Sequence, residues 1–396
     1  MTPYDYQTRL ADDAYEILRE DMIVYLACEE RTGKSLAAIL VAERCEQVST
    51  VLIITKKQAL GGWLETLKQF KHLKDYTVIN YHKASKVAGK FDLIMLDESH
   101  NYISAFPKVG KLWKDVNKLT AFVPLIYISA TPHAQGPQQL YHQFALSSWS
   151  PWKMHNSFYE WFRMYGKPYS IKINCIDIQQ YDKVDVYSAL ACVKHLFVTA
   201  TRQELGFEHE PTDVVHHIKL DSTTREVYNE LVKHDLVELR VGMVVCDNSS
   251  KLRTSLHQLE GGTIKIDVDR YVLTNTEKVD FILNKFGDNS SLVIMYNYIA
   301  EKQKLEQHFK NALILQATSY AEGVDLYEYQ DLVIYSQDFS TARHTQRRAR
   351  QSNKKRSIPI NVHFLLVKGA ISAQVYKTVS LNKRNFVDSV FKRSTI

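Results

Sequence analysis

Short runs of wholly apolar residues, separated by longer amphipathic stretches, constrain the fold of this chain more than any other feature. Five such runs occur in the first 150 residues: Ile23–Cys28, Val51–Thr55, Thr77–Asn80, Leu93–Leu96 and Leu125–Ser129. Strands that are apolar on both faces, with helices between them, indicate a parallel sheet covered on both sides. We expect two of these helices over Ser35–Cys45 and Gly61–Phe70.

This alternation stops between residues 150 and 215 and then resumes. The interruption contains the aromatic-rich segment NSFYEWFRMYGKPY, which we interpret as a surface helix and a connector. A helix is expected next over Thr224–Leu239. Further strands are expected at His216–Leu220, Ser291–Met295, Ala312–Gln316, Asp331–Tyr335 and Asn361–Val367. The 396 residues therefore predict two α/β lobes, joined near 195–215, in keeping with a usual domain size of roughly 100–200 residues.

Composition excludes several classes of protein. The five cysteines are far apart and none has C-x-x-C spacing, which argues against a zinc site or a disulfide framework and favours a reducing cytoplasm. The N-terminus does not resemble a signal peptide, and no apolar run approaches the ~18 residues that cross a membrane. The net charge is +6, and the stretch from Arg343 to Arg356 holds seven basic residues and no acidic one. Such a run is ordinarily a solvated face.

The apolar run Ile23–Cys28 leads directly into EERTGKS and then into a helical segment. A helix N-terminus presents free N–H groups and a positive dipole end, which suit phosphate. In this interpretation Gly33 lets the backbone approach, Lys34 neutralises the β and γ oxygens of ATP, and Ser35 binds Mg²⁺. The full P-loop pattern requires glycine where this chain has Cys28. The alternative is an ordinary turn between a strand and a helix, capped by Ser35.

A second motif follows about sixty residues later, where the run Leu93–Leu96 ends in Asp97-Glu98-Ser99-His100. Two adjacent carboxylates after an apolar strand repel each other unless each has a separate task. We expect Asp97 to hold Mg²⁺ and Glu98 to orient and deprotonate the attacking water. The alternative, a solvated start of a loop, does not explain why a phosphate-binding sequence lies upstream.

With GKS, DESH and the Ser129-Ala-Thr131-Pro segment in this order, the chain resembles the superfamily 2 helicases. It looks most similar to the Swi/Snf-type translocases and to compact phage-encoded DNA helicases, over nearly its whole length. The resemblance implies two tandem RecA-like lobes, each a mostly parallel sheet with helices on both faces. Lobe 1 would span 1–205, with a connector near its end, and lobe 2 would span 206–396.

The resemblance also implies roles for residues of the first lobe. Gln7 would read adenine, although a glutamine near an N-terminus is ordinarily a surface residue. The nucleotide would also contact the loop residues Arg31, Thr32, Gly33, Lys34 and Ser35. The segment VLIITKKQALGGW would contact nucleic acid through Lys56, Lys57 and Trp63. Ser129 and Thr131 would couple the ATP site to the bound nucleic acid. The alternative for this segment is a helix N-cap.

In the second lobe the motif near Ser319 would place Gly323 at a close turn and Asp325 toward the nucleotide. The segment TARHTQRRARQSNKKR resembles the last motif of the family, in which two arginines three residues apart point to one side. Arg347 and Arg350 fit that spacing and would stabilise the charge that develops on the γ-phosphate. The upstream residues depart from the family pattern, so Arg348 remains an alternative.

The implied activity is hydrolysis of ATP with Mg²⁺ between the lobes, coupled to movement along nucleic acid, with DNA favoured over RNA. We expect a monomeric motor in the cytoplasm, or in the host cytoplasm if a phage encodes it. One alternative is a duplex translocase, remodeller or annealing motor that does not separate strands, and another is an RNA helicase. A different class, a P-loop switch that binds nucleotide without a track, would show an ATPase rate that nucleic acid does not change.

Overall fold

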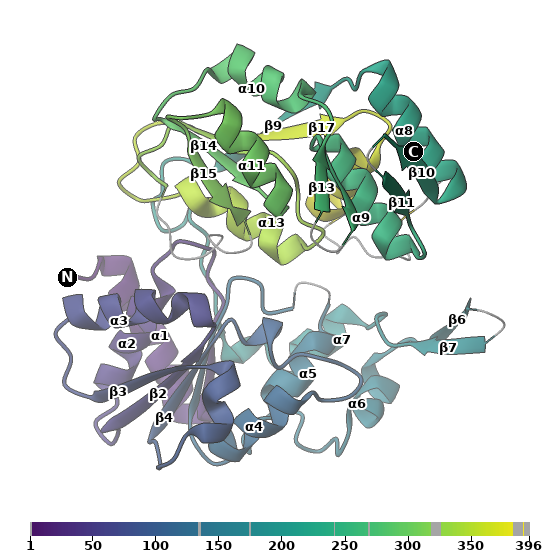
Figure 1. The fold of residues 1–396 in the computed structure, drawn as a ribbon. Helices are drawn as coiled ribbons and strands as arrows, with labels where there is room; N and C mark the ends of the chain where they lie inside the picture. Colours follow the sequence, from purple (N-terminus) through teal and green to yellow (C-terminus); the bar gives the residue numbers. More distant parts are fainter. Residues whose placement is uncertain are drawn as a thin grey trace. The chain divides into compact units, whose positions relative to one another are not determined.

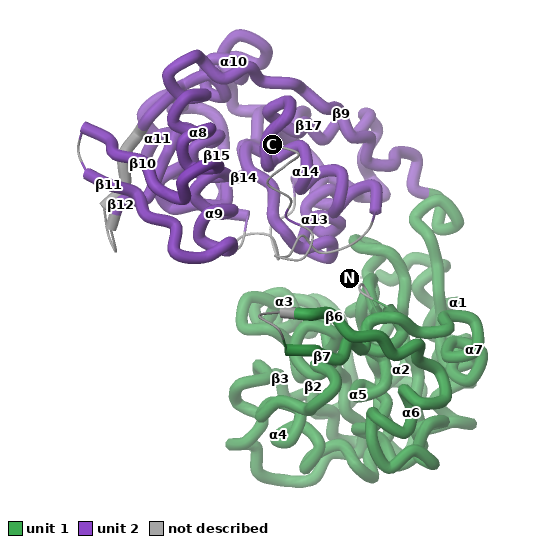
Figure 2. The backbone as a smooth tube through the Cα atoms, turned by 90° about the vertical axis from the view of Figure 1, so that its right-hand side faces the viewer, with its two compact units in different colours: residues 1–206 green, residues 207–396 purple. Residues whose placement is uncertain are grey.

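The computed structural model describes residues 2–133, 136–173, 176–240, 242–267, 270–317, 326–382 and 391. The chain divides into two compact units, Met1–Gly206 and Phe207–Ile396 (Figure 2). This division differs by one residue from the boundary expected between 205 and 206. Each unit has a hydrophobic core of its own.

Unit 1 is built on a six-stranded parallel sheet with the order β3-β2-β4-β5-β1-β8. Its strands are β1 (Ile23–Leu26), β2 (Thr50–Thr55), β3 (Asp75–Asn80), β4 (Leu93–Asp97), β5 (Leu125–Ile128) and β8 (Phe197–Val198). The five strands expected in this region are confirmed. Four of them, β1, β2, β4 and β5, have almost wholly buried side chains, because helices cover both faces of the sheet.

The helices of unit 1 follow from the parallel connections. The crossovers β1–β2 and β2–β3 run one way along the sheet and β4–β5 runs the other way, so their helices cover opposite faces (Figure 1). The helices are α1 (Asp5–Asp21), α2 (Lys34–Arg44), α3 (Leu60–Gln69), α4 (Lys111–Thr120), α5 (Gln138–Phe144), α6 (Phe158–Tyr165) and α7 (Val186–Ala191). Short 3₁₀ turns are η1 (Lys57–Ala59), η2 (Tyr81–Lys86), η3 (Ser99–Asn101) and η4 (Lys194–Leu196).

The aromatic-rich stretch after residue 150 is not the surface helix that the sequence led us to expect. Trp152 and Trp161 are 2% and 0% exposed, and their rings lie 5.3 Å apart in the core of unit 1. Helix α6 buries Phe158 and Phe162 beside them. A two-stranded antiparallel hairpin follows, formed by β6 (Tyr169–Ile173) and β7 (Ile176–Gln180). The aromatic side chains therefore extend the core of unit 1.

Unit 2 contains a five-stranded parallel sheet with the order β15-β14-β16-β17-β9. Its strands are β9 (Pro211–Ile218), β14 (Leu292–Tyr296), β15 (Leu313–Gln316), β16 (Asp331–Ile334) and β17 (Ile360–Val367). All five strands were expected, although β9 begins five residues before the predicted start. The fold class predicted from the sequence, two mostly parallel sheets with helices around them, is confirmed.

The helix expected over Thr224–Leu239 is shorter than predicted. Helix α8 (Ser222–His234) ends where Asp235 adopts a left-handed conformation with φ of 58°. The next residues form β10 (Leu236–Leu239), which pairs antiparallel with β11 (Gly242–Val245). The β-branched pair Val237 and Val244 lies in this ladder, where such side chains pack well.

The remaining elements of unit 2 surround its sheet. The helices are α9 (Ser249–Glu260), α10 (Glu277–Phe286), α11 (Ile299–His308), α13 (Thr341–Arg348) and α14 (Ile371–Tyr376). A second hairpin joins β12 (Thr263–Asp267) and β13 (Arg270–Leu273), η5 (Ala349–Gln351) is a 3₁₀ turn, and η6 (Lys377–Leu381) is a turn of π-helix. Among the described residues, no helix combines the length and the apolar character that crossing a bilayer demands.

Candidate nucleotide site

The carboxyl ends of three neighbouring strands bring the sequence motifs of unit 1 together. In the sheet β5 lies between β4 and β1, and Ile128 of β5 pairs with both Asp97 and Leu26. The register continues past the strands, because the backbone N–H of Glu98 donates to the Ile128 carbonyl at 2.8 Å. The N–H of Ser129 donates to the Leu26 carbonyl at 3.2 Å. Ligands of open α/β sheets bind at this edge.

The loop that follows β1 has the features of a phosphate-binding turn. Gly33 has a left-handed φ of 76° and precedes α2, whose free N–H groups are at that end. The ammonium group of Lys34 turns back into the loop and donates to the carbonyls of Cys28 and Glu29, at 2.9 and 2.7 Å. A cation held at a helix N-terminus fits a polyphosphate. The departure from the family pattern at Cys28 does not prevent this arrangement.

Gln7 lies against the loop although 26 residues separate it from Gly33. Its Nε2 donates to the Gly33 carbonyl at 3.3 Å, and its Oε1 accepts from the Tyr4 backbone at 2.9 Å. A Cβ on Gly33 would come within 2.1 Å of that Nε2 and would displace the Gln7 side chain, and the left-handed φ of Gly33 also disfavours any residue with a side chain. Gln7 is 5% exposed, which differs from the surface residue that was the alternative.

The other expected nucleotide contacts lie around the same loop. Thr32 is buried, and its hydroxyl donates to the Glu29 carbonyl at 2.8 Å. Arg31 has a left-handed φ of 68°, which is uncommon for a residue other than glycine. Ser35 is the second residue of α2 and is partly exposed.

Asp97 ends β4 with its carboxylate held from two other elements. Its Oδ2 accepts from the Thr55 hydroxyl at 2.6 Å and from the Trp63 indole N–H at 2.9 Å. Both contacts use the same oxygen, so neither occupies Oδ1. A carboxylate oriented in this way fits a hard cation such as Mg²⁺.

This contact changes our interpretation of the segment expected to bind nucleic acid. Trp63 is 2% exposed and donates to Asp97, so its side chain lies in the core and not on a surface that nucleic acid could contact. Lys56 is also buried, at 7% exposure. Lys57 is exposed and remains available for phosphate contacts.

Glu98 is connected to Ser129 and Thr131 through His100, which sequence reasoning did not select. The His100 Nδ1 lies 2.8 Å from the Ser129 hydroxyl and 3.4 Å from the Glu98 carboxylate. Its Nε2 lies 3.3 Å from the Thr131 hydroxyl, and the Thr131 N–H donates to the Ser129 hydroxyl at 3.0 Å. Burial, with a smaller contribution from Lys56, lowers the pKa of His100 to about 3, so the ring is neutral.

Glu98 itself stands in a left-handed conformation with φ of 52°. Such strain in a residue other than glycine is typical of functional sites. Its neighbour Ser99 donates at 2.6 Å to Gln143 of α5, and Gln143 in turn donates to the Pro132 carbonyl at 2.9 Å. Buried hydrogen bonds therefore connect the DESH and SATP motifs twice, through His100 and through Gln143.

In unit 2 the basic segment is largely buried, contrary to the solvated face that was the ordinary alternative. Arg347 is 2% exposed and donates to Asn297 at 2.8 Å and to Asp338 at 3.1 Å. Desolvation lowers the pKa of Arg347 to about 10, against the opposing effect of Asp338. Arg350 is 6% exposed and lies in η5, just after α13 ends.

Two other arginines of this segment have structural partners. Arg348 donates to the Asp213 carboxylate at 2.5 Å and to the Pro211 carbonyl at 2.9 Å. Arg356, the last residue of the run that is ordinarily a solvated face, is 3% exposed. Its guanidinium group donates to backbone carbonyls that include those of Tyr329 and Pro359, so this end of the run does not face solvent. Gly323 and Asp325 lie outside the described residues.

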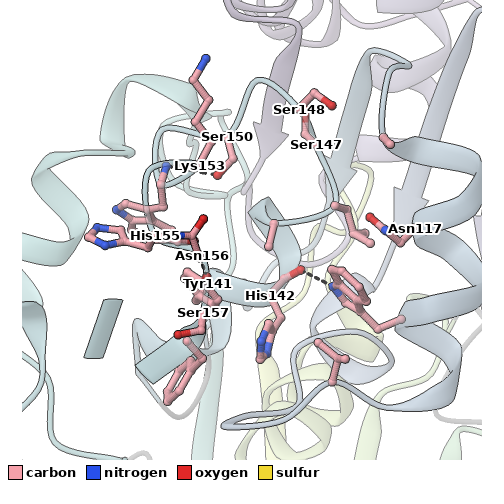
Figure 3. A pocket seen from close by; sticks show the side chains of 17 residues that line it. Asn117, Tyr141, His142, Ser147, Ser148, Ser150, Lys153, His155, Asn156 and Ser157 are labelled. Carbon is pink, nitrogen blue, oxygen red and sulfur yellow. Dashed lines mark hydrogen bonds between the residues drawn. The ribbon is translucent and has the colours of Figure 1, made fainter. Parts of the chain in front are cut away.

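A separate cavity of about 460 Å³ lies in unit 1, by α4, α5 and the segment after α5 (Figure 3). Asn117, Tyr141 and His142 are among its lining residues, together with serines and Lys153 of the following segment. None of the residues expected to bind nucleotide lines this cavity. It is distinct from the edge of the sheet at which the motifs meet.

Comparison with known proteins places these observations beside solved structures. No family model matches the chain, and no curated protein matches it. The Sulfolobus solfataricus SWI2/SNF2 ATPase core in complex with dsDNA is similar, with 14% identity, a TM-score of 0.45 and coverage of 96% of this chain and 91% of that chain. In this chain two parallel sheets, each surrounded by helices, form the two units. The core domain of the same ATPase gives 13% identity, a TM-score of 0.43 and coverage of 98% and 93%.

A third similar structure is the ATP-dependent Type ISP restriction-modification enzyme LlaBIII bound to DNA. Identity is 10% and the TM-score is 0.48, over 93% of this chain and 28% of that chain. These three TM-scores are all below 0.5, and the similarities carry no conclusion about the activity of this chain.

Proposed function

We propose that this chain is an ATP-hydrolysing nucleic-acid motor of the superfamily 2 type, which moves along DNA as a monomer. The observation that supports this most is the shared edge of β4, β5 and β1. At the carboxyl ends of these neighbouring strands, or just beyond them, lie Lys34 of the loop after β1, the adjacent carboxylates Asp97 and Glu98, and a serine–threonine pair. A fold that only needed a turn at each strand would not require this set of groups.

The roles within unit 1 follow from the contacts. Lys34 leaves the Cys28 and Glu29 carbonyls to bind the phosphates, while Gln7 reads the adenine and Thr32 maintains the loop. Ser35 and Asp97 would hold Mg²⁺, which supplies positive charge to the phosphate oxygens when it is bound. Glu98 accepts a proton from a water molecule while the water oxygen forms a bond to the γ-phosphorus. The bond between the γ-phosphorus and the β–γ bridging oxygen breaks, and the products are ADP and phosphate.

We assign the stabilising arginines of unit 2 to Arg347 and Arg350, as the motif resemblance implies. Both are buried in this structure, and Arg347 binds Asp338 and Asn297, so it would have to exchange these partners for phosphate. Arg348 is the weaker alternative because its guanidinium group binds Asp213 and the Pro211 carbonyl. Gly323 and Asp325 are assigned to the nucleotide site from the motif resemblance alone.

Coupling between ATP hydrolysis and the bound nucleic acid would pass through His100. A change at Glu98 on hydrolysis reaches Ser129 and Thr131 through the single neutral ring between them. Lys57 is the exposed cation of the segment after β2 and is the contact that we propose for the nucleic-acid backbone. Phosphate contacts of this kind provide grip with little sequence preference.

The test is the ATPase rate of the full chain with no nucleic acid, single-stranded DNA, duplex DNA, forked DNA and RNA in parallel. A motor on DNA predicts strong stimulation by at least one DNA, and a rate that no nucleic acid changes would favour a nucleotide switch. Unwinding of the forked duplex, compared with displacement of a triplex strand, separates a helicase from a duplex translocase. Stimulation by RNA alone would favour an RNA helicase.

A further inference from the structure

The phosphate loop of this chain carries an unusual charge balance. Within Cys28–Ser35 the acids Glu29 and Glu30 match the bases Arg31 and Lys34, so the loop has no net positive charge. A site for a polyanion gains from positive charge, and two carboxylates beside it oppose binding. The Glu30 side chain is only 13% exposed, so water screens its charge poorly.

Arg202 is the residue that meets both carboxylates. Its Nε lies 3.7 Å from the Glu29 carboxylate, and its Nη1 lies 3.6 Å from the Glu30 carboxylate. The Nη1 also donates to the Glu30 carbonyl at 3.3 Å, and the Arg202 backbone N–H donates to the Glu29 carboxylate at 2.7 Å. Arg202 is 7% exposed, so these contacts are sheltered from solvent.

The backbone holds Arg202 in this place. Strand β8 pairs with β1 at the edge of the sheet, and the pairing continues beyond both strands. The Ala27 N–H donates to the Val198 carbonyl at 2.8 Å, and the Glu29 N–H donates to the Ala200 carbonyl at 3.0 Å. The segment that carries Arg202 therefore runs beside the phosphate loop as an extension of the sheet.

We propose that Arg202 is a positioning residue of the nucleotide site, which cancels the charge of Glu29 and Glu30 and turns their carboxylates away from the phosphates. With Arg202 included, the loop and its partner carry one net positive charge, which leaves Lys34 effective toward ATP. Arginine suits this role better than lysine because its planar fork can reach two carboxylates at once. The inference rests on the proposed function of the loop.

The test is the dissociation constant of a fluorescent, non-hydrolysable ATP analogue with Mg²⁺, measured on the full chain. Arg202→Ala should weaken binding at least tenfold, about 1.4 kcal/mol, and Arg202→Lys should bind with an intermediate constant. Adding Glu29→Gln and Glu30→Gln to Arg202→Ala should restore binding to within about threefold of the native chain or better, because no carboxylate then remains in the loop to oppose the phosphates. Arg19→Ala, which removes an exposed arginine of α1, is the matched control and should not change binding.

Rescue is the result that a merely structural role cannot produce. If the triple variant binds as weakly as Arg202→Ala, the charge proposal is wrong. If Arg202→Ala binds like the native chain, Arg202 does not position the site. If circular dichroism shows that Arg202→Ala does not fold, the double variant Glu29→Gln/Glu30→Gln, which retains Arg202, tests the proposal instead. This double variant should bind the analogue as tightly as the native chain or more tightly. A tenfold loss of its binding would overturn the proposal. A native chain that does not bind the analogue would instead contradict the proposed function.

Discussion

The indole N–H of Trp63 donates to the Asp97 carboxylate at 2.9 Å, from α3 to the end of β4. Thr55 donates to the same oxygen, so two neutral donors orient the carboxylate that we assign to Mg²⁺. Groups that orient a metal ligand in this way commonly contribute 10–100-fold to metal affinity, as an order of magnitude. We therefore propose that Trp63 orients Asp97 and does not contact nucleic acid.

Trp63→Phe keeps the aromatic ring and removes the donor. We expect the Mg²⁺ concentration for half-maximal ATPase to rise about tenfold, while nucleic-acid affinity stays the same. Direct titration of Mn²⁺ gives a second readout that does not depend on turnover. Trp149→Phe, at a more exposed tryptophan of the same unit, is the control. A loss of nucleic-acid binding with an unchanged metal requirement would return Trp63 to the role expected from the sequence.

Lys34→Ala and Glu98→Gln should both abolish turnover but differ in nucleotide binding. The first removes the ammonium group that we assign to the phosphates, so ATP binding should fall as well. The second removes the proton acceptor and leaves Asp97 with its two donors, so ATP should still bind and remain unhydrolysed. Equilibrium binding of ATP and single-turnover hydrolysis check both variants. Native hydrolysis by Glu98→Gln would show that another group is the base.

Arg350→Lys retains the charge and loses the planar fork. We expect the DNA-stimulated ATPase rate to fall at least tenfold, about 1.4 kcal/mol of transition-state stabilisation, with nearly unchanged DNA affinity. Lys355→Ala, at an exposed position of the same segment, should show the reverse pattern. Because Arg350 is buried, the unfolding temperature of each variant has to be compared with that of the native chain. Normal hydrolysis by Arg350→Lys would move the assignment to Arg347.

Binding of DNA should depend strongly on salt and weakly on sequence. Lysine and arginine side chains that meet phosphates release condensed counterions, so the logarithm of the affinity should fall linearly with the logarithm of the salt concentration. Lys57→Ala should reduce that slope by about one, whereas the buried Lys56 is a less informative target. A tenfold preference for one sequence over its scramble, with little effect of salt, would contradict a motor that grips the backbone.

Acid should destabilise the chain. Burial lowers the pKa of His100 and His257 to about 3 and that of His216 and His344 to about 4. The unfolded chain therefore binds more protons than the folded chain below pH ~6.5, so the stability present above that pH is lost as the pH falls toward 3. Each of the fully buried His100 and His257 would cost about 2 kcal/mol at pH 5.

Urea unfolding at pH 7.5 and pH 5.0 checks this expectation. His257→Gln should reduce the difference between the two midpoints, because it removes one of the groups that must stay neutral. His195→Gln, at a largely exposed histidine, should leave the difference as it is. Equal midpoints at both pH values in the native chain would show that these rings are not buried as the structure has them.

The strands, and the motifs that follow them, could be predicted from local sequence pattern. Runs such as Leu93–Leu96 are wholly apolar and short, and this local pattern, repeated between helical segments, favours a buried strand of a parallel sheet. Parallel strands then bring their carboxyl ends to one edge. GKS, DESH and Ser129-Ala-Thr131 each follow such a strand, and the register of β4, β5 and β1 brings them together at this edge.

The partners of these motifs could not be predicted from local sequence, because they come from distant parts of the chain. Arg202 meets Glu29 and Glu30 across more than 170 positions of sequence, and no local pattern encodes a contact of that span. The sequence predicts a nucleic-acid contact for Trp63, whereas in the structure the indole of this α3 residue donates to Asp97. Arg347 and Arg350 read as a solvated or catalytic pair, and the fold of unit 2 buries both. Propensity and spacing act over a few residues, whereas burial and hydrogen bonding depend on which elements the sheet order makes neighbours.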